Sequence, residues 1–169
     1  MKKQPASRSA EASSPVPIAL KSILVPVDFS ESARKALQYA LAFARLFKAE
    51  ITLLHVAPEL AEESRVTFSM PELQQELLQD AAQNLAKEIE RAATPEVSLK
   101  PVVKKGTPYY EIVEAAREMN ADLIVIGTHG RTGLKHVFMG STAERVVRHA
   151  PCPVLVVRER EHEFVTAAQ

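Results

Sequence analysis

The stretch LIVIGTHGRTGLKHVFMGSTAE, residues 123–144, joins a short apolar run directly to a segment rich in glycine. The run from Leu123 to Ile126 is typical of a strand that is covered on both faces. Four of the five glycines in the chain follow it, at Gly127, Gly130, Gly133 and Gly140. Because glycine costs roughly 0.5 to 1 kcal/mol relative to alanine, this concentration predicts a loop that needs a bare, bent main chain.

The end of the glycine segment predicts the start of a helix. Ser141 and Glu144 have the spacing of a capping box, with Ser141 as the N-cap and Glu144 reaching back to it. We therefore expect a helix that begins at Ser141 and runs to about His149. The apolar run over 153–157 then predicts a final strand.

Strand and helix patterns alternate in the N-terminal part of the chain. Apolar residues over 23–27 predict a first strand that stops at Asp28. Ser30 is a good N-cap for a helix over 31–47, whose apolar residues recur at helical spacing. A second buried strand is expected over 51–56.

The same alternation continues toward the glycine segment. A polar connection leads to a helix that is expected to begin near Pro71. The strand expected over 97–104 contains Pro101, which has no N–H and is therefore predicted at the edge of a sheet. Thr107 and Pro108 have the residue types of an N-cap and a first helical position, and they predict a third helix.

This order of elements predicts an α/β fold. Right-handed crossovers between successive strands give a five-stranded parallel doubly wound sheet, in the order 3-2-1-4-5, with helices on both faces. A chain of 169 residues with 46% hydrophobic residues suits one core of this kind.

Composition excludes several classes of partner. Lys plus Arg and Asp plus Glu both number 21, so no bulk positive field attracts nucleic acid or an anionic membrane. Cys152 is the single cysteine, which fits a reducing compartment, and we expect a cytoplasmic protein. The opening residues lack a stretch typical of a signal peptide, and the apolar runs are far shorter than the roughly 20 residues of a membrane-spanning helix.

The predicted sheet has an obvious ligand position. Doubly wound sheets bind ligands beyond the carboxyl ends of the strands, where the strand order reverses. Asp28 and Gly127 end two strands that we expect to meet there. The helix that starts at Ser141 would direct its unpaired N–H groups and positive dipole end at the same crevice, which attracts phosphate. Asp28 could accept hydrogen bonds from ribose hydroxyls, so the residues predict a nucleotide site.

The glycine spacing departs from two well-known phosphate loops. A Walker A loop requires a lysine after its last glycine, and neither Gly133 nor Gly140 is followed by one. A Rossmann fingerprint follows the first strand as G-x-G-x-x-G, whereas this loop follows the fourth and has wider spacing. The pattern G-x-x-G, nine residues and Gly-Ser, starting at Gly127 and ending at Ser141, resembles the ATP-binding signature of the universal stress protein family.

The resemblance extends over about residues 20–158. It includes ILVPVDFSESARKALQYALAFA from Ile23, LLHV from Leu53, GTPYYEIVEAA from Gly106 and the whole stretch from Ala121 to PVLVV. It implies one universal stress protein domain over 20–158 with the adenine nucleotide alpha-hydrolase-like fold. Residues 1–19 are expected to form a disordered arm, and residues 159–169 a C-terminal tail.

The resemblance also implies the residues of an ATP site, with Mg²⁺ accompanying the nucleotide. Asp28 would meet ribose or adenine, Val56 would offer backbone groups to adenine, and the glycine segment would hold the phosphates. The complete implied set is Pro26, Val27, Asp28, Val56, Ile126, Gly127, Gly130, Gly140, Ser141 and Thr142. Because every glycine of the signature is present, the resemblance favours the ATP-binding branch of the family.

The family forms dimers through its last strand, so the resemblance implies a homodimer through Val154 to Val157. The expected function is that of a dimeric, ATP-dependent regulator of a stress response. Two alternatives remain open: a slow ATPase or self-phosphorylating enzyme that modifies Ser141 or Thr142, and an interaction module with a vestigial site. No catalytic residue is predicted, because Asp28 is the only aspartate near the inferred site.

Other reactive residues fit less specific roles. The histidines show no spacing that predicts a metal site. Cys152, between two prolines, is interpreted as a small buried apolar residue. His129, Arg131 and Lys135 could contact phosphate or lie in solvent, and Gly106 most simply relieves a turn before the third helix.

Overall fold

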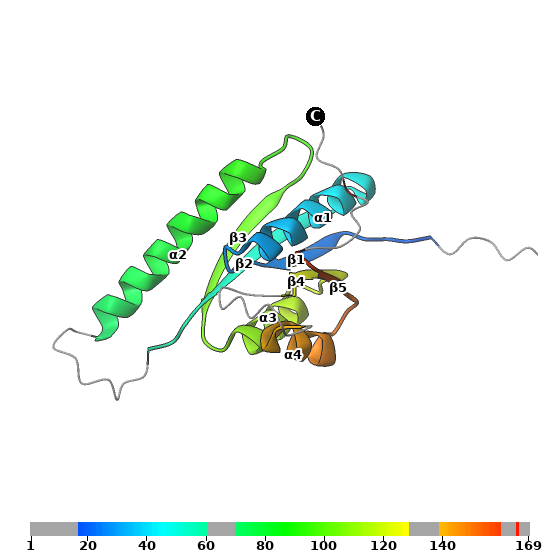
Figure 1. Ribbon diagram of the computed structural model, residues 1–169. Helices are drawn as coiled ribbons and strands as arrows, with labels where there is room; N and C mark the ends of the chain where they lie inside the picture. The colour runs from blue at the N-terminus through cyan, green and yellow to red at the C-terminus, as the bar shows by residue number, and fades with distance from the viewer. Residues whose placement is uncertain (1–16, 61–69, 129–138, 160–164, 166–169) are drawn as a thin grey trace, which may run out of the picture.

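The computed structural model describes residues 17–60, 70–128, 139–159 and 165, which form a sheet with helices packed against it (Figure 1). The strands are β1 (Ser22–Pro26), β2 (Glu50–Ala57), β3 (Leu99–Lys105), β4 (Leu123–Gly127) and β5 (Val154–Val157). The helices are α1 (Glu31–Phe47), α2 (Met70–Ala92), α3 (Pro108–Glu118) and α4 (Ser141–His149). Strand boundaries agree with the predicted ones to within two residues.

All the strand pairs are parallel, and their order in the sheet is β3-β2-β1-β4-β5. The predicted fold class and strand order are therefore confirmed. β1 is central, with β2 on one side and β4 on the other, so the strand order reverses beside it. The carboxyl ends of β1 and β4 consequently flank the switch point of the sheet.

The core consists of two apolar layers, one on each face of the sheet. Ile23 and Val25 of β1 lie in the layer that contains the buried side chains of α1 and α2. Leu24, between them, lies in the layer that contains those of α3 and α4. This alternation follows from the two-residue period of a strand. Two helices therefore cover each face, as the separation of α1 and α2 from α3 and α4 in Figure 1 shows.

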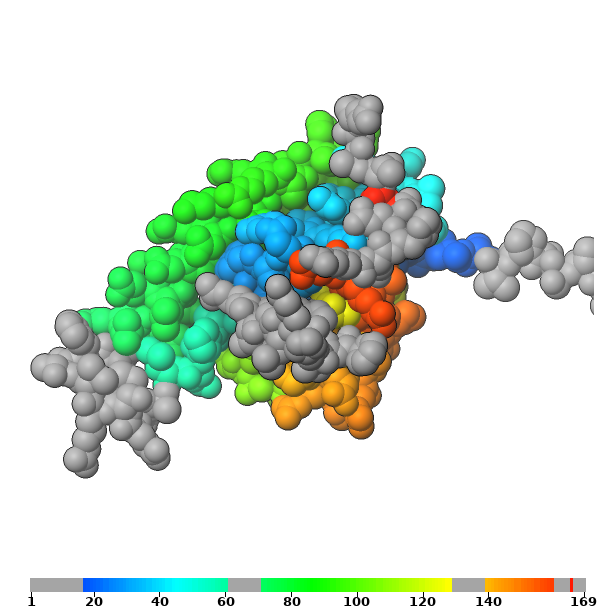
Figure 2. All heavy atoms as spheres, viewed as in Figure 1, coloured from blue at the N-terminus to red at the C-terminus, as the bar shows by residue number. Residues whose placement is uncertain are grey.

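On one face, α1 and α2 lie side by side (Figure 2). Glu88 of α2, whose side chain is only 8% exposed, forms an ion pair with Arg34 of α1 at 3.4 Å. Arg91 contacts the same carboxylate at 2.8 Å. Two guanidinium groups thus compensate the buried carboxylate for its lost hydration.

The ends of α1 and the place of β3 agree with the sequence pattern. Ser30 is the N-cap, and its Oγ accepts a hydrogen bond from the backbone N–H of Ala33 at 3.3 Å. Lys48 ends the helix in a left-handed conformation with φ of 56°, and its N–H bonds the carbonyl of Ala44. β3 is an edge strand, as predicted from Pro101.

Candidate functional site

A cleft of about 220 Å³ opens at the carboxyl ends of β1, β2 and β4, beside the switch point. Its walls also include the first turns of three helices, through Ala33 of α1, Pro108 of α3 and Ser141 of α4. Parallel strands direct their carboxyl ends to one edge, and the helices that follow them begin there, which explains this convergence. The cleft occupies the position in which doubly wound sheets bind ligands.

The structure brings together every described residue that was predicted for the nucleotide site. These residues line the same cleft and are Pro26, Val27, Asp28, Val56, Ile126, Gly127, Gly140, Ser141 and Thr142. Gly130 lies outside the described residues, as do His129, Arg131 and Lys135. The shared cleft is a geometric finding, and the role of these residues in nucleotide binding stays a prediction.

Several further lining residues are not predicted from the sequence. They are Ala33, Leu54, His55, Pro108, Ile112, Thr128 and Ala143. The apolar members have the sequence pattern of core positions, and nothing in that pattern separates the floor of a cleft from a core. His55 does carry a signal, because a polar side chain at the carboxyl end of a central strand lies where ligands bind.

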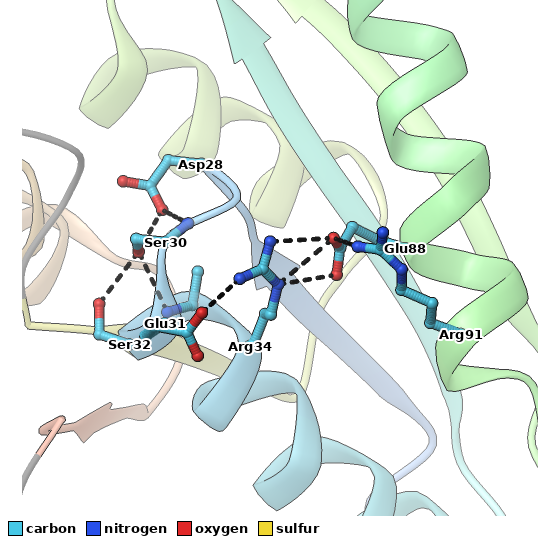
Figure 3. Close-up of polar contacts among 8 residues, drawn as sticks. Asp28, Ser30, Glu31, Ser32, Arg34, Glu88 and Arg91 are labelled. Carbon is cyan, nitrogen blue, oxygen red and sulfur yellow. Dashed lines mark hydrogen bonds and ion pairs between the residues drawn. The ribbon is translucent and has the colours of Figure 1, made fainter.

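Asp28 lies in the turn between β1 and α1 and is held there by the next serine. Its Oδ1 accepts hydrogen bonds from the backbone N–H of Ser30 at 3.1 Å and from the Ser30 hydroxyl at 2.6 Å. Figure 3 shows the two side chains pointing toward each other at the start of α1. The carboxylate therefore has a fixed orientation at the cleft wall.

A second hydrogen bond, from His55 of β2, stabilises this turn. Nδ1 of the buried His55 lies 2.7 Å from the carbonyl oxygen of Val27. Because a carbonyl only accepts, Nδ1 carries the proton of this hydrogen bond. The His55 ring also contacts the ring of Phe29, with centroids 4.6 Å apart. Phe29 has a φ of 67°, an uncommon conformation for a bulky residue, so these contacts hold a turn that is strained.

Gly127 meets a requirement that the glycine pattern alone does not reveal. A Cβ at this position would lie 2.8 Å from the carbonyl carbon and the Oγ of Ser32, in the first turn of α1. Glycine at 127 is therefore needed for α1 to pack against the end of β4. This close packing is separate from any approach of the main chain to a ligand.

The start of α4 corrects one prediction, because Ser141 is not the N-cap. Gly140 holds that position with φ of −68° and ψ of 150°, and its carbonyl accepts from the N–H of Glu144 at 3.0 Å. The N–H of Gly140 already donates to the carbonyl of Thr128 at 2.7 Å. The capping box is thus absent, and Glu144 pairs instead with Arg148 at 2.8 Å.

With Gly140 as the N-cap, the start of α4 has the features that favour an anion. Ser141 and Thr142 now lie in the first turn, where backbone N–H groups and the helix dipole favour negative charge. Gly140 offers these N–H groups no side-chain oxygen, and the helix has no side-chain cap bond. Both residues line the cleft, so this end of the helix borders the space in which a ligand would lie.

Thr107 shows a smaller difference of the same kind. It occupies the N-cap position of α3, as predicted, but its side chain makes no capping hydrogen bond. Its carbonyl accepts from the N–H of Glu111 at 3.1 Å. Gly106, just before it, has a φ of 135°, which confirms that a glycine relieves this turn.

Two structural absences hold for the part of the chain that the structure describes. No group of three or more His, Cys, Asp and Glu side chains in that part is arranged to hold a metal ion. No helix there combines the length and the apolar character that crossing a membrane requires. Cys152, predicted to be buried, is only half-buried, and it packs against the apolar layer beside α3 and α4. Burial raises the pKa of its thiol, and Asp122 raises it further.

Comparison with known proteins identifies the family. The sequence model described as the universal stress protein family matches residues 19–158. The chain belongs to the universal stress protein family. Among the universal stress proteins that it resembles, MJ0531 of Methanocaldococcus jannaschii is 37% identical over 144 residues, which are 85% of this chain and 85% of that protein.

Solved structures of other universal stress proteins share the fold. The structure of MJ0577 from Methanocaldococcus jannaschii is 35% identical, with a TM-score of 0.76, and the match covers 86% of this chain and 100% of that chain. A universal stress protein from Archaeoglobus fulgidus in complex with dAMP is 26% identical, with a TM-score of 0.51. That match covers 83% of this chain and 99% of that chain.

Proposed function

We propose that this universal stress protein belongs to the ATP-binding branch of its family and binds ATP in the cleft between β1 and β4. In this proposal it acts as a dimeric, nucleotide-dependent regulator of a stress response. One observation carries the proposal: the cleft holds a fixed carboxylate at Asp28 and the start of α4 at Ser141, with apolar residues in the same wall. A nucleotide has three groups that match these features: ribose hydroxyls for the carboxylate, phosphates for the helix start, and a base with flat apolar faces for the apolar residues.

The apolar part of the cleft suits the base. Val27, Leu54 and Ile126 line it and are each no more than 6% exposed, so a planar ring could replace the little water that they contact. Val56, at the carboxyl end of β2, would provide backbone groups to the edge of adenine. The dAMP complex of the Archaeoglobus fulgidus protein supports an adenine nucleotide as the ligand.

The start of α4 suits the phosphates. Main-chain N–H groups at Ser141 and Thr142 would donate to phosphate oxygens, and the helix dipole would add to the attraction. Mg²⁺ would enter with the nucleotide and supply charge neutralisation, held by phosphate oxygens and water, because this ion needs few protein ligands.

The cleft favours binding over rapid catalysis. Among its described lining residues, Asp28 is the only carboxylate, and its Oδ1 is engaged by Ser30. Phosphoryl transfer requires a group that orients the nucleophile at the phosphate end, and Asp28 is assigned to the nucleoside end. Any hydrolysis or self-phosphorylation is therefore expected to be slow.

The proposed dimer forms through the edge of the sheet at β5. Both edges are candidates, but β3 carries Lys100, Pro101, Lys104 and Lys105, which discourage pairing. β5 has the sequence VLVV, and Val154, Leu155 and Val156 are only partly buried. A two-fold partner strand would cover this uncharged edge.

Calorimetric titration of the nucleotide-stripped protein with ATP tests the binding proposal, and substitutions at Gly140 sharpen the test. Its φ and ψ suit any residue, and aspartate is a favoured N-cap. In Gly140→Asp the new carboxylate would bond the first-turn N–H groups of α4 and repel phosphate. We expect a thermal midpoint equal to or above that of the wild type, together with loss of ATP binding.

Gly140→Ala is the matched control, since it adds a Cβ without an oxygen that could cap the helix. It should keep ATP affinity within about fivefold, a change of roughly 1 kcal/mol. Wild-type protein that releases no heat with millimolar ATP would overturn the proposal. Equal ATP affinity in wild type and Gly140→Asp would show that α4 is not the phosphate site.

A further inference from the structure

We propose that Ser30 and His55 are positioning residues, which fix the Asp28 carboxylate before a nucleotide arrives and so allow the cleft to recognise ribose hydroxyls. The inference rests on the proposed nucleotide function. It goes beyond that function because it assigns Ser30 and His55 a role toward the Asp28 carboxylate.

The first step is the hydrogen bonding of Ser30. A serine hydroxyl has one proton to donate, and a carboxylate only accepts, so the Ser30 proton goes to Asp28 Oδ1 at 2.6 Å. The Ser30 oxygen then accepts from the N–H of Ala33 at 3.3 Å and from the hydroxyl of Ser32 at 3.1 Å. Contacts on both sides therefore fix the hydroxyl that holds Asp28 (Figure 3).

The second step is the backbone of the turn. Phe29 lies between Asp28 and Ser30 in the left-handed region, and such a conformation persists only where the surroundings determine it. His55 supplies two such contacts, a hydrogen bond from Nδ1 to the Val27 carbonyl and a ring contact with Phe29. The turn is thus stabilised by the hydroxyl of Ser30, the N-cap of α1, and by the imidazole of His55 in β2.

The consequence concerns binding rather than stability. Hydrogen bonds from two hydroxyls to a carboxylate are charge-assisted, and a carboxylate that is already oriented loses little conformational freedom when they form. A mobile Asp28 would lose part of that gain at each binding event. Loss of positioning should therefore weaken recognition of the ribose hydroxyls and leave the contacts to base and phosphate unchanged.

The experiment compares ATP with 2′,3′-dideoxy-ATP, which lacks both hydroxyls, by titration calorimetry. For the wild type we expect ATP to bind at least about tenfold more tightly. In Ser30→Gly, glycine keeps most of the N-cap stability of α1 and removes the hydroxyl. In Ser30→Gly the preference for ATP over dideoxy-ATP should fall to within about threefold of that in Asp28→Ala. Ser30→Thr keeps a hydroxyl and should retain the wild-type preference.

A double-mutant cycle separates positioning from general damage. In the Asp28→Ala background, Ser30→Gly should leave ATP affinity unchanged within about twofold, because no carboxylate remains to be positioned. A structural role alone would weaken ATP and its dideoxy analogue equally, and an unchanged preference in Ser30→Gly would overturn the role of Ser30.

Two substitutions divide the contribution of His55. His55→Phe keeps a ring against Phe29 without the donor, and His55→Asn keeps a donor near the place of Nδ1 without the ring. A lower preference for ATP over dideoxy-ATP in either variant supports the positioning role, because a direct contact of the ring with base or phosphate would affect both nucleotides alike. An unchanged preference in both overturns the role of His55.

The wild type distinguishes the two levels of the proposal. If it binds neither nucleotide, the proposed function fails and this inference fails with it. If it binds both with equal affinity, ATP binding stands and the recognition of ribose hydroxyls by Asp28 is overturned.

Discussion

A Cβ on Gly127 would lie 2.8 Å from the Oγ of Ser32 and equally close to its carbonyl carbon. Overpacking of this kind forces backbone shifts that cost typically about 1 to 3 kcal/mol. We expect Gly127→Ala to lower the free energy of unfolding by that amount, measured by urea denaturation.

The double variant Gly127→Ala with Ser32→Ala tests the cause. Ser32→Ala removes the Oγ, but the carbonyl carbon and oxygen of residue 32 would remain within 2.9 Å of the new Cβ. We therefore expect no recovery beyond the effect of Ser32→Ala alone. Full recovery would show that the side chain, and not the backbone of α1, sets the requirement for glycine.

A second prediction concerns Glu88, which joins α1 to α2. Its carboxylate is buried, but Arg34 and Arg91 have side-chain exposures of 38% and 66%. Glu88→Ala should cost about 2 kcal/mol, less than a fully buried pair, because water can solvate both freed guanidinium groups. Glu31→Ala is the matched control.

Glu31 also pairs with Arg34, at 2.6 Å, but its own side chain is 75% exposed. Its removal should cost less than about 0.5 kcal/mol. Equal losses in the two variants, by denaturation, would contradict the view that burial makes the Glu88 interaction the stronger one.

Sequence patterns predicted the sheet because they depend on local periodicity and on chain order. Apolar runs, the Ser30 cap and Pro101 each reflect a requirement of the segment in which they lie, and the parallel topology follows from their alternation. The position of Asp28 at the switch point follows from the same topology.

The remaining features depend on contacts between distant segments. The N-cap of α4 is Gly140 and not Ser141, and the N–H of Gly140 bonds the carbonyl of Thr128, a contact that no local motif records. Likewise, the packing reason for Gly127 involves Ser32, and the importance of His55 involves Val27 and Phe29. Tertiary contacts determined each of these features, so the residue types alone could not reveal them.

A third prediction concerns the reactivity of Cys152. Burial raises the pKa of this thiol, Asp122 raises it further, and a hydrogen bond from the Ile124 backbone opposes both. Because the thiolate is the reactive form, iodoacetamide should modify native Cys152 several-fold more slowly near neutral pH than the same residue in urea. Equal rates in the two states would contradict the shift.

The same shift predicts a pH dependence of stability. A pKa that is raised in the native state means that the protonated thiol is favoured by folding. This contribution is present below the pKa of the unfolded thiol and is lost as the pH rises through the native pKa. The difference in unfolding free energy between wild type and Cys152→Ala should therefore shrink with rising pH.

The last prediction tests the proposed dimer with a proline at the β5 edge. The carbonyls of Pro153 and Val157 accept from Ile124 and Thr128, so alternate residues of β5 bond toward β4. Val156 lies between them in this alternation, and its main-chain N–H and C=O point to the open edge. Val156→Pro would remove an edge donor without breaking the ladder to β4.

We expect the wild type to sediment as a dimer and Val156→Pro to sediment as a monomer at the same concentration, with a thermal midpoint only a few degrees lower. Leu155→Pro is the contrasting variant, since residue 155 bonds toward β4 and its loss should destabilise the protomer itself. A Val156→Pro protein that remains dimeric would place the interface elsewhere on the surface. Such a result would leave the uncharged edge of β5 without a partner strand.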